Sequence, residues 1–372
     1  MSHYSKHRWH PHFLRILIFG ILALASCQLS AVERSAPSPT PHPSLTPTSA
    51  TDPIEFTQAE IDSLNSLQKV DEHPLFVMHY QGPFRETTYA APAAEDLQRS
   101  NTEDRNLPPP WACSLFATLA DPQSGVFGRN FDWEFSPALL LFTDPPDGYA
   151  SVSMVDLAYL FDASSVAHLM ELDLNERKPL LNAPVMPFDG LNERGLAIGM
   201  AAVPHSPTPN DPNNESVDSL RIMRMILDHA ASVEEALPIM RSVNILWNNG
   251  PPLHYLLADA NGTAALVEFV AGEMVVHYNA NPWHQTTNFL LSNTSGSADG
   301  ICTRYDLLTK RLQEEQGDLS LGEAMKLLAD VSQSSTQWSV VYQLHTGRIS
   351  LAMGSSYSEV HAFQLETPAL GD

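Results

Sequence analysis

Residues 111–133 read WACSLFATLADPQSGVFGRNFDW, and this stretch decides the fold that we expect. Cys113 opens an apolar, strand-like run; a glycine-containing turn follows, and a second apolar run ends in Arg129 and Asp132. Two such runs around a turn predict a β-hairpin, which brings both charged side chains back beside the thiol. A guanidinium lowers the pKa of a thiol, and a carboxylate can hold an amine or a thiol in place. The stretch therefore indicates a functional thiol with charged neighbours. A lone cysteine at the start of a strand, in contrast, is more often a small core residue.

Composition limits the kinds of partner. The chain has 372 residues, 43% of them hydrophobic, which is enough for a sizeable core in one large domain or two smaller ones. The formal charge of −23, from 20 basic and 43 acidic residues, argues against nucleic acid or an anionic membrane surface as a partner. No acidic run is long enough to form a tail, so we expect the charge to be spread over a solvated surface.

A targeting segment is expected at the N-terminus. Basic residues precede the apolar run 16–25, which is too short for a comfortable transmembrane helix. The run ends in Leu-Ala-Ser before Cys27, which resembles a bacterial lipoprotein signal. The resemblance implies that residues 1–27 form the signal with its lipobox and that Cys27 carries the lipid. The expected location is extracytoplasmic and membrane-anchored; an ordinary secretory signal, giving a secreted protein, is the alternative.

The rest of the chain divides into three parts. Residues 28–53 are rich in Pro, Ser and Thr and predict a disordered tether. Residues 54–112 carry a helix over 57–70, with Thr57 and Glu60 as a capping box, and a strand over 74–80, and end after a triple-proline break. Residues 113–372 alternate blocks of strands with helix pairs, without a regular βαβ rhythm, which predicts an α+β layered domain. We expect strands at 113–119, 125–131, 138–143, 149–161, 195–203, 253–259, 263–270, 285–292, 338–344 and 348–353, and helices at 216–230, after Ser232, at 300–315 and at 320–331.

Five ordered segments resemble one enzyme group, the N-terminal-nucleophile hydrolases of linear amide C–N bonds. This group includes choloylglycine hydrolases, penicillin V acylases, acid ceramidase and N-acylethanolamine acid amidase. The resemblance runs from residue 74 to residue 365 and implies a four-layer αββα sandwich. The segments are Cys113 with Gly-Arg-Asn-Phe-Asp at 128–132, Phe-Asp-Gly-Leu-Asn-Glu-Arg-Gly-Leu at 188–196, Thr-Asn at 287–288, Thr-Arg-Tyr at 303–305 and Trp-Ser-Val-Val-Tyr at 338–342.

The resemblance implies that the chain cuts itself. Cys113 would attack the carbonyl of Ala112 by an N-to-S acyl shift and become the first residue of a second chain. The new α-amine, whose pKa is typically about 7.7–8.0, would serve as the base for its own thiol. Asp132 would hold this amine, and Arg129 would lower the pKa of the thiol. The alternative is that Arg129 and Asp132 form a plain structural ion pair.

The resemblance also implies the groups that activate the carbonyl. Asn192 and Asn288 would form an oxyanion hole, and Arg304 would support the site electrostatically. Asn293 competes with Asn288 for its role, and Asn192 has the alternative of terminating a turn. Arg304 could instead be a solvated helix residue. Cys302 is expected to be a buried structural cysteine unpaired with Cys113, and Trp133 and Trp338 are expected in the core.

The substrate expectation comes from the long segment before Cys113. It looks more like acid ceramidase and N-acylethanolamine acid amidase, whose first chain stays bound, than like simple choloylglycine hydrolases. We therefore expect a small, lipid-like N-acyl amide as substrate, with both chains remaining associated. An acyltransferase, a penicillin V or bile-salt acylase, and a lipoprotein binding module with an idle thiol are the alternatives. No cofactor or metal is expected, because no His/Cys/Asp cluster with ligand spacing follows the signal segment, and a serine hydrolase elbow is missing.

Overall fold

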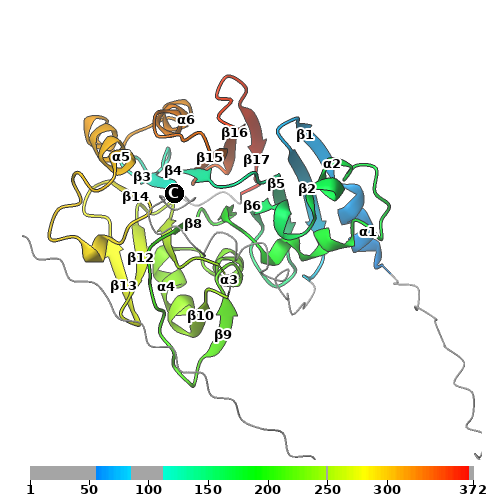
Figure 1. The fold of residues 1–372 in the computed structure, drawn as a ribbon, viewed down its shortest axis with the longest axis horizontal. Coiled ribbons are helices and arrows are strands. Elements are labelled where there is room, and N and C mark those ends of the chain that lie inside the picture. The colour runs from blue at the N-terminus through cyan, green and yellow to red at the C-terminus, as the bar shows by residue number, and fades with distance from the viewer. Residues whose placement is uncertain (1–55, 85–111, 249, 368–372) are drawn as a thin grey trace, which may run out of the picture. The chain divides into compact units, whose positions relative to one another are not determined.

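The computed structural model of the chain stacks two β-sheets face to face and places helices on both outer sides (Figure 1). It describes residues 56–84, 112–248 and 250–367, all within one unit that spans 55–372. Within these ranges, no helix combines the length and apolar character needed to cross a membrane. The predictions for the signal segment, for Cys27, for the tether over 28–53 and for the triple-proline break lie outside the described residues.

The larger sheet has nine strands among the described residues, and most neighbours run antiparallel. The exception is β2, which lies parallel to β5 over seven residue pairs. Its order is β1 (Gln68–Asp71), β2 (Leu75–Gln81), β5 (Ala138–Asp144), β6 (Ser151–Asp156), β7 (Asp189–Asn192), β8 (Ala197–Ala202), β11 (Leu253–Ala258), β12 (Ala264–Val270) and β13 (Glu273–Tyr278).

The smaller sheet has six strands among the described residues, and β3 with β4 forms the hairpin predicted from residues 111–133. A separate parallel pair, β9 (Glu215–Asp218) with β10 (Val243–Leu246), lies outside both sheets. The order of the smaller sheet is β14 (Trp283–Thr286), β3 (Ser114–Thr118), β4 (Val126–Asp132), β15 (Thr336–Gln343), β16 (Arg348–Met353) and β17 (His361–Gln364).

Helices cover the outer faces of both sheets, with α5 and α6 on the smaller sheet and α3 and α4 on the larger one (Figure 1). The far end of the larger sheet is covered by α1, α2 and the 3₁₀ helices η2 and η3. The predicted αββα order of layers is confirmed. The helices are α1 (Gln58–Asn65), α2 (Ala163–Ala167), α3 (Arg221–His229), α4 (Val233–Arg241), α5 (Thr303–Glu314) and α6 (Leu321–Asp330), with η2 (Leu157–Tyr159), η3 (Lys178–Val185) and η4 (Leu291–Asn293).

Alternation along β3 shows how the layers are built from the sequence. Leu115 and Ala117 pack between the two sheets, whereas Phe116 packs under α5 and α6. Successive side chains of a strand point to opposite faces, so an uninterrupted apolar run is buried on both. Gly128 of β4 lies opposite Phe116, and a Cβ there would come within 2.6 Å of its ring. The glycine of the Gly-Arg-Asn-Phe-Asp segment is therefore required by packing.

The largest differences between predicted and observed bounds occur in four elements. The helix expected over 57–70 ends at Asn65, because the chain turns and 68–71 pairs with β2 as β1. The strand expected over 149–161 ends at Asp156, whose side chain accepts from the amide of Ala158 and caps η2. The helix expected over 216–230 begins only at Arg221, because 215–218 pairs with β10. The strand expected over 285–292 covers 283–286 and is followed by η4.

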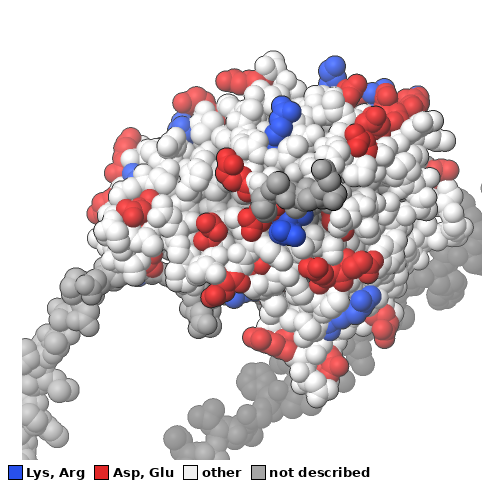
Figure 2. All heavy atoms as spheres, turned by 180° about the vertical axis from the view of Figure 1, so that it is seen from behind, with Lys and Arg blue, Asp and Glu red and all other residues white. Residues whose placement is uncertain are grey.

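Acidic side chains are spread over the face shown in Figure 2, between many neutral residues, and do not gather in one run. This distribution agrees with the solvated acidic surface expected from composition.

Candidate active site

Cys113 lies directly before β3 and is almost fully buried. The antiparallel register of β3 with β4 pairs Leu115 with Arg129, which turns the guanidinium towards the thiol. The Nη2 atom of Arg129 lies 4.0 Å from Sγ of Cys113. The amide of Ala112 donates to the carbonyl oxygen of Asp132 over 3.2 Å, so the chain just before the cysteine also follows β4. The expected proximity of Cys113, Arg129 and Asp132 is present.

Arg129 is held by a carboxylate that the sequence reasoning missed. Its Nη1 atom lies 2.5 Å from Oδ2 of Asp189 and donates to the carbonyl of Phe188 over 2.9 Å. Asp189 also accepts from the hydroxyl of Tyr342 over 2.6 Å and from Nε1 of Trp338 over 3.3 Å. All these side chains are buried, so the guanidinium has one fixed orientation. The Asp-Gly pair at 189–190 was a signal for this site, but it also fits a turn.

Asp132 has one oxygen that is satisfied and one that is not. Oδ1 accepts from the hydroxyl of Thr336 over 2.5 Å, whereas the buried Oδ2 has no hydrogen-bond partner among the described residues. Burial raises the pKa of Asp132 to about 7, although Thr336 and the charges of Arg304 and Arg129 act in the opposite direction. An unpartnered buried carboxylate oxygen is costly, so its place beside Ala112 and Cys113 needs an explanation.

Arg304, in the first turn of α5, contacts the backbone on both sides of the junction. Its Nη1 atom donates to the carbonyl of Ala112 over 3.0 Å, to the carbonyl of Cys113 and to the hydroxyl of Ser114. Its Nη2 atom donates to Oδ1 of Asn288 over 3.0 Å. The guanidinium is therefore not a solvated surface charge. It binds the carbonyl groups on both sides of the peptide bond between Ala112 and Cys113.

Asn288 is brought to the site, and Asn293 is not. The amide nitrogen of Asn288 donates to the carbonyl of Ala202 over 2.8 Å, and its oxygen is held by Arg304. An amide nitrogen carries two hydrogens, so one remains for a substrate. Asn293 is exposed in η4.

The prediction that Asn192 supplies an oxyanion donor is wrong. Its amide nitrogen donates to the carbonyls of Leu227 and Ala230 over 3.0 and 2.7 Å, at the end of α3. Its side-chain oxygen accepts from the backbone of Arg194 and Leu196. Asn192 therefore shapes the β7–β8 turn and ties it to α3, which is the turn alternative left open by the sequence.

The pKa of the Cys113 thiol is not lowered in this structure. Burial raises the pKa of Cys113, and the nearby carboxylate of Asp132 adds to this, so the opposing effect of Arg129 does not prevail. The expectation of a lowered thiol pKa is therefore not met. Cys302 is also free and only partly buried at the N-cap position of α5, where a buried structural cysteine was expected.

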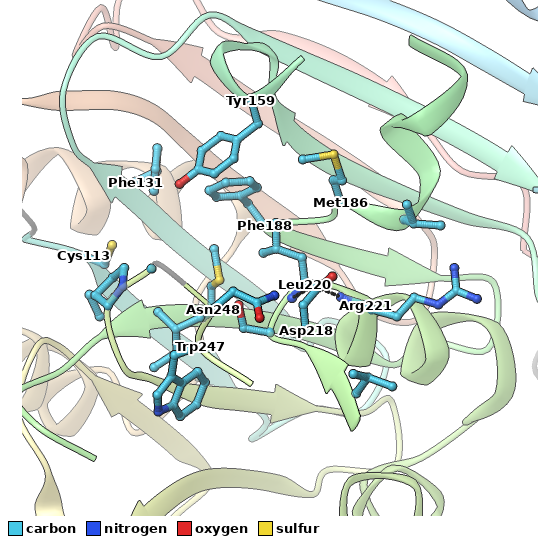
Figure 3. A pocket seen from close by; sticks show the side chains of 18 of the residues that line it. Cys113, Phe131, Tyr159, Met186, Phe188, Asp218, Leu220, Arg221, Trp247 and Asn248 are labelled. Carbon is cyan, nitrogen blue, oxygen red and sulfur yellow. Dashed lines mark hydrogen bonds between the residues drawn. The ribbon is translucent and has the colours of Figure 1, made fainter. Parts of the chain in front are cut away.

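A cavity of about 700 Å³ opens from the thiol. Figure 3 shows Cys113 at one end and Arg221 at the other, with Tyr159, Phe188 and Trp247 between them. Its wall also includes Trp133, which we expected in the core, whereas Trp338 is a core residue as expected. The remaining apolar lining residues are Phe131, Val185, Met186, Met200, Ala202, Val217, Leu220, Pro251 and Leu253.

Residues 113–293 match the sequence profile of a known family, described as linear amide C–N hydrolases, choloylglycine hydrolase family. This match, over just under half of the chain, agrees with the resemblance found in the sequence motifs. The enzyme class that it indicates is a hydrolase of linear amide C–N bonds. The match begins at Cys113 itself, although the described chain also includes residues before it.

Known relatives of this amide hydrolase are distant. A penicillin V acylase from Pectobacterium atrosepticum is 22% identical over 262 residues, which are 62% of this chain and 68% of that protein. Among solved structures, a mutant of the conjugated bile acid hydrolase from Clostridium perfringens aligns with a TM-score of 0.49 and 18% identity, over 68% of this chain and 92% of that one. The penicillin V acylase from Agrobacterium tumefaciens gives 0.48 and 16% identity, over 68% and 86%.

Proposed function

We propose that this amide hydrolase is a self-processing cysteine enzyme that cleaves N-acyl amides with an apolar acyl group. The observation that carries the proposal is the place of Cys113. Its thiol lies at one end of a cavity whose lining combines many apolar residues with some charged and polar ones, and the carbonyl of the preceding residue, Ala112, is already held by Arg304. The start of the family match at Cys113 supports the same reading.

Self-cleavage uses the bond that Arg304 holds. The sulfur of Cys113 attacks the carbonyl carbon of Ala112, and the carbonyl electrons move to the oxygen, where Arg304 stabilises the negative charge. The C–N bond then breaks, the proton from the thiol passes to the nitrogen of Cys113, and a thioester joins Ala112 to the sulfur. Water hydrolyses the thioester, which leaves a carboxylate on Ala112 and a free thiol and amine on Cys113.

The cut supplies the missing partner of Asp132. The new amine of Cys113 forms beside the carboxylate oxygen that has no partner in the uncut chain. A cation there favours the ionised carboxylate, and departure of Ala112 opens the thiol to water. The amine is then the base that activates its own thiol, and Arg129 stabilises the thiolate that results.

Substrate turnover repeats the same chemistry. The acyl carbonyl takes the place of the Ala112 carbonyl next to Arg304 and Asn288, the thiolate attacks it, and the amine of the substrate leaves with a proton. Water then releases the acid from the thioester. The aromatic and aliphatic lining of the cavity suits a lipid-like acyl chain or another apolar acyl group.

We also propose that the two chains stay together after the cut. Strand β2, which precedes the junction, lies between β1 and β5 inside the larger sheet, and Phe76 and Met78 are buried under α1 and η3. Removing them would expose this core. The test is native gel filtration of the cut protein, where separation of the fragments without denaturant would contradict the proposal.

The location is a separate proposal and rests on the sequence alone. Cys27 would carry a lipid that anchors the enzyme outside the cytoplasm. Metabolic labelling with a fatty acid should mark the wild-type protein and not a Cys27→Ala variant. A cleaved, unlabelled and freely soluble wild-type protein would favour the secretory alternative.

The function is tested with purified full-length protein. Intact-mass measurement should find two fragments divided between Ala112 and Cys113, and Cys113→Ala should abolish them. A panel of N-acylethanolamines, ceramide, conjugated bile salts, penicillin V and acyl-homoserine lactones should reveal hydrolysis that thiol alkylation stops. Cys302→Ala is the matched control and should keep both properties. An uncut wild-type chain without thiol-dependent hydrolysis would sink the proposal.

A further inference from the structure

Glu268 of β12 is a fully buried carboxylate that binds the segment just after Asn288. Its Oε1 atom accepts from the amide of Leu291 over 2.7 Å, and its Oε2 atom accepts from the amide of Ser292 over 2.9 Å. Both amides belong to η4, which begins three residues beyond Asn288. One side chain therefore fixes the backbone on the C-terminal side of this asparagine.

Histidines extend the network to the other side of Asn288. Nδ1 of His254 lies 3.6 Å from Oε1 of Glu268, and Nε2 of His254 lies 3.3 Å from the hydroxyl of Thr286, two residues before Asn288. Nε2 of His277 lies 3.2 Å from Oε2 of Glu268 and 2.8 Å from the hydroxyl of Ser292. The chain is thus held on both sides of Asn288 by contacts that share the carboxylate of Glu268.

The same strands also hold the Asn288 side chain. Its amide donates to the carbonyl of Ala202 in β8, and Ala202 pairs with Leu253, the residue before His254 in β11. Glu268, His254, His277 and Asn288 are not among the residues that line the cavity. Asn288 reaches the Ala112–Cys113 peptide bond through Arg304, so we expect an effect of this network on the reaction to pass through the Asn288 segment.

A buried charge at this place needs a reason. A hydrophobic residue of similar volume often replaces a buried ionic group without loss of stability, so packing alone does not call for a carboxylate. Burial raises the pKa of Glu268, but the nearby His254 imidazole and the hydrogen bonds with His277 and Ser292 outweigh this effect and keep the carboxylate ionised. His284 lies behind the cluster, with Nε2 2.9 Å from the carbonyl of His277. Among the described residues, no group of three His, Cys, Asp or Glu side chains has the arrangement of a metal site.

We propose that Glu268, with His254 and His277, is the positioning unit that fixes the amide of Asn288 for activation of the substrate carbonyl. This inference rests on the proposed function. The carboxylate does not touch the substrate; it sets the position of the residue that does.

The first test is Glu268→Gln, which keeps the shape but replaces one accepting oxygen by an NH2 group that faces a backbone donor. A displacement of about 1 Å in a catalytic group can lower the rate by about a hundredfold, so we expect kcat to fall by about tenfold to a hundredfold. KM should change by less than about threefold, because the cavity lining is untouched. Alkylation of Cys113 by iodoacetamide needs no carbonyl donor and should keep its wild-type rate.

Asp259→Asn is the matched control. Asp259 is also a buried carboxylate that accepts from backbone amides, of Val233, Asn261 and Thr263, but it lies at the far end of β11 from Leu253. We expect a comparable loss of stability without the fall in kcat. An equal fall in kcat in both variants would mean that the effect is general destabilisation.

A double-mutant cycle then asks whether Glu268 acts through Asn288. In an Asn288→Ala background, Glu268→Gln should lower kcat no further; a full additional fall would overturn the proposal. Hydrogen exchange at the amides of Leu291 and Ser292 gives a readout that needs no turnover, and unchanged protection in Glu268→Gln would also overturn it. Should Glu268→Gln fail to fold, His254→Gln takes its place in the same cycle. Failure of the proposed function is distinct, because it would show as an inactive wild-type protein.

Discussion

Nη1 of Arg129 lies 2.5 Å from Oδ2 of Asp189, and neither side chain is exposed to solvent. Phe131 and Trp338 cover the guanidinium, with its carbon 4.9 and 5.9 Å from their ring centres. A buried cation enclosed by rings and one carboxylate has a single orientation, and here that orientation directs its second nitrogen at Cys113. The position of the Arg129 charge near the thiol is therefore fixed by Asp189, which lies in a strand of the other sheet.

Asp189→Asn should destabilise the fold strongly. Removing one partner of a buried pair leaves the other charge uncompensated, which typically costs about 3–5 kcal/mol. Urea unfolding should report this loss as a lower midpoint at an unchanged slope. Asp228→Asn is the control, because the side chain of Asp228, paired with Arg224, keeps 11% of its surface exposed to water, and its loss should cost less. Equal losses in the two variants would contradict the interpretation.

Arg304→Ala should slow self-cleavage. Loss of one donor to a developing oxyanion typically lowers a rate by about 10²–10³-fold. Arg304→Lys keeps the charge, but a single ammonium group cannot bind Asn288 and the Ala112 carbonyl at once as the two guanidinium nitrogens do. We therefore expect an intermediate rate. The fraction of cut chain is followed on denaturing gels after synthesis. Arg311, two turns further along the same helix, pairs with Glu314 and Glu315, so Arg311→Ala should cut at the wild-type rate; cleavage of Arg304→Ala at that rate would refute the assignment.

The uncut chain should lose stability as the pH rises. The pKa of Asp132 is raised from 3.8 to about 7, so the folded uncut chain binds this proton more tightly than the unfolded chain. Its contribution is complete below the unfolded pKa and is lost as the pH rises through about 7. Burial raises the pKa of Asp156 in the same way.

Thermal unfolding of the Cys113→Ala chain tests the direction of this pH dependence of stability. Its Tm should fall between about pH 5 and about pH 8, and adding Asp132→Asn should make the fall smaller. Asp156→Asn in the same background should remove a separate part of the fall. Parallel curves for all these chains would show that neither carboxyl carries the effect.

Met186→Trp should shorten the acyl chains that the enzyme accepts. Met186 lies in the cavity wall away from Cys113, among aromatic side chains (Figure 3). A bulkier side chain there should lower kcat/KM for a dodecanoyl amide by about tenfold or more, while an acetyl amide is little affected. Uniform loss for both substrates would place the acyl chain elsewhere.

Local patterns predicted the parts of the site that are close in sequence. The hairpin from Cys113 to Asp132 follows from two apolar runs around a turn, and its register alone brings Arg129 to the thiol. The capping pair Ser320 and Glu323 marked the start of α6 for the same local reason. These features needed no knowledge of distant segments.

The sequence pattern could not predict the roles of residues whose contacts lie far away in the chain. Asn192 and Asp189 lie in one motif, and both fit a turn; only the end of α3, at Leu227 and Ala230, shows that Asn192 is structural. Asp189 acquires its role from Arg129, sixty positions away in the chain. Glu268 carried no local signal, because a single acidic residue within an apolar strand says nothing about what it binds.

The parallel pairing of β2 with β5 joins segments on opposite sides of the Ala112–Cys113 bond. Before the cut, an unfolded molecule regains this pairing within one chain, by closing a loop. After the cut, two molecules must meet, so refolding becomes second order and depends on protein concentration. Under the proposed self-cleavage, folding becomes a one-time event, because dilute, denatured fragments do not readily recover the mature state.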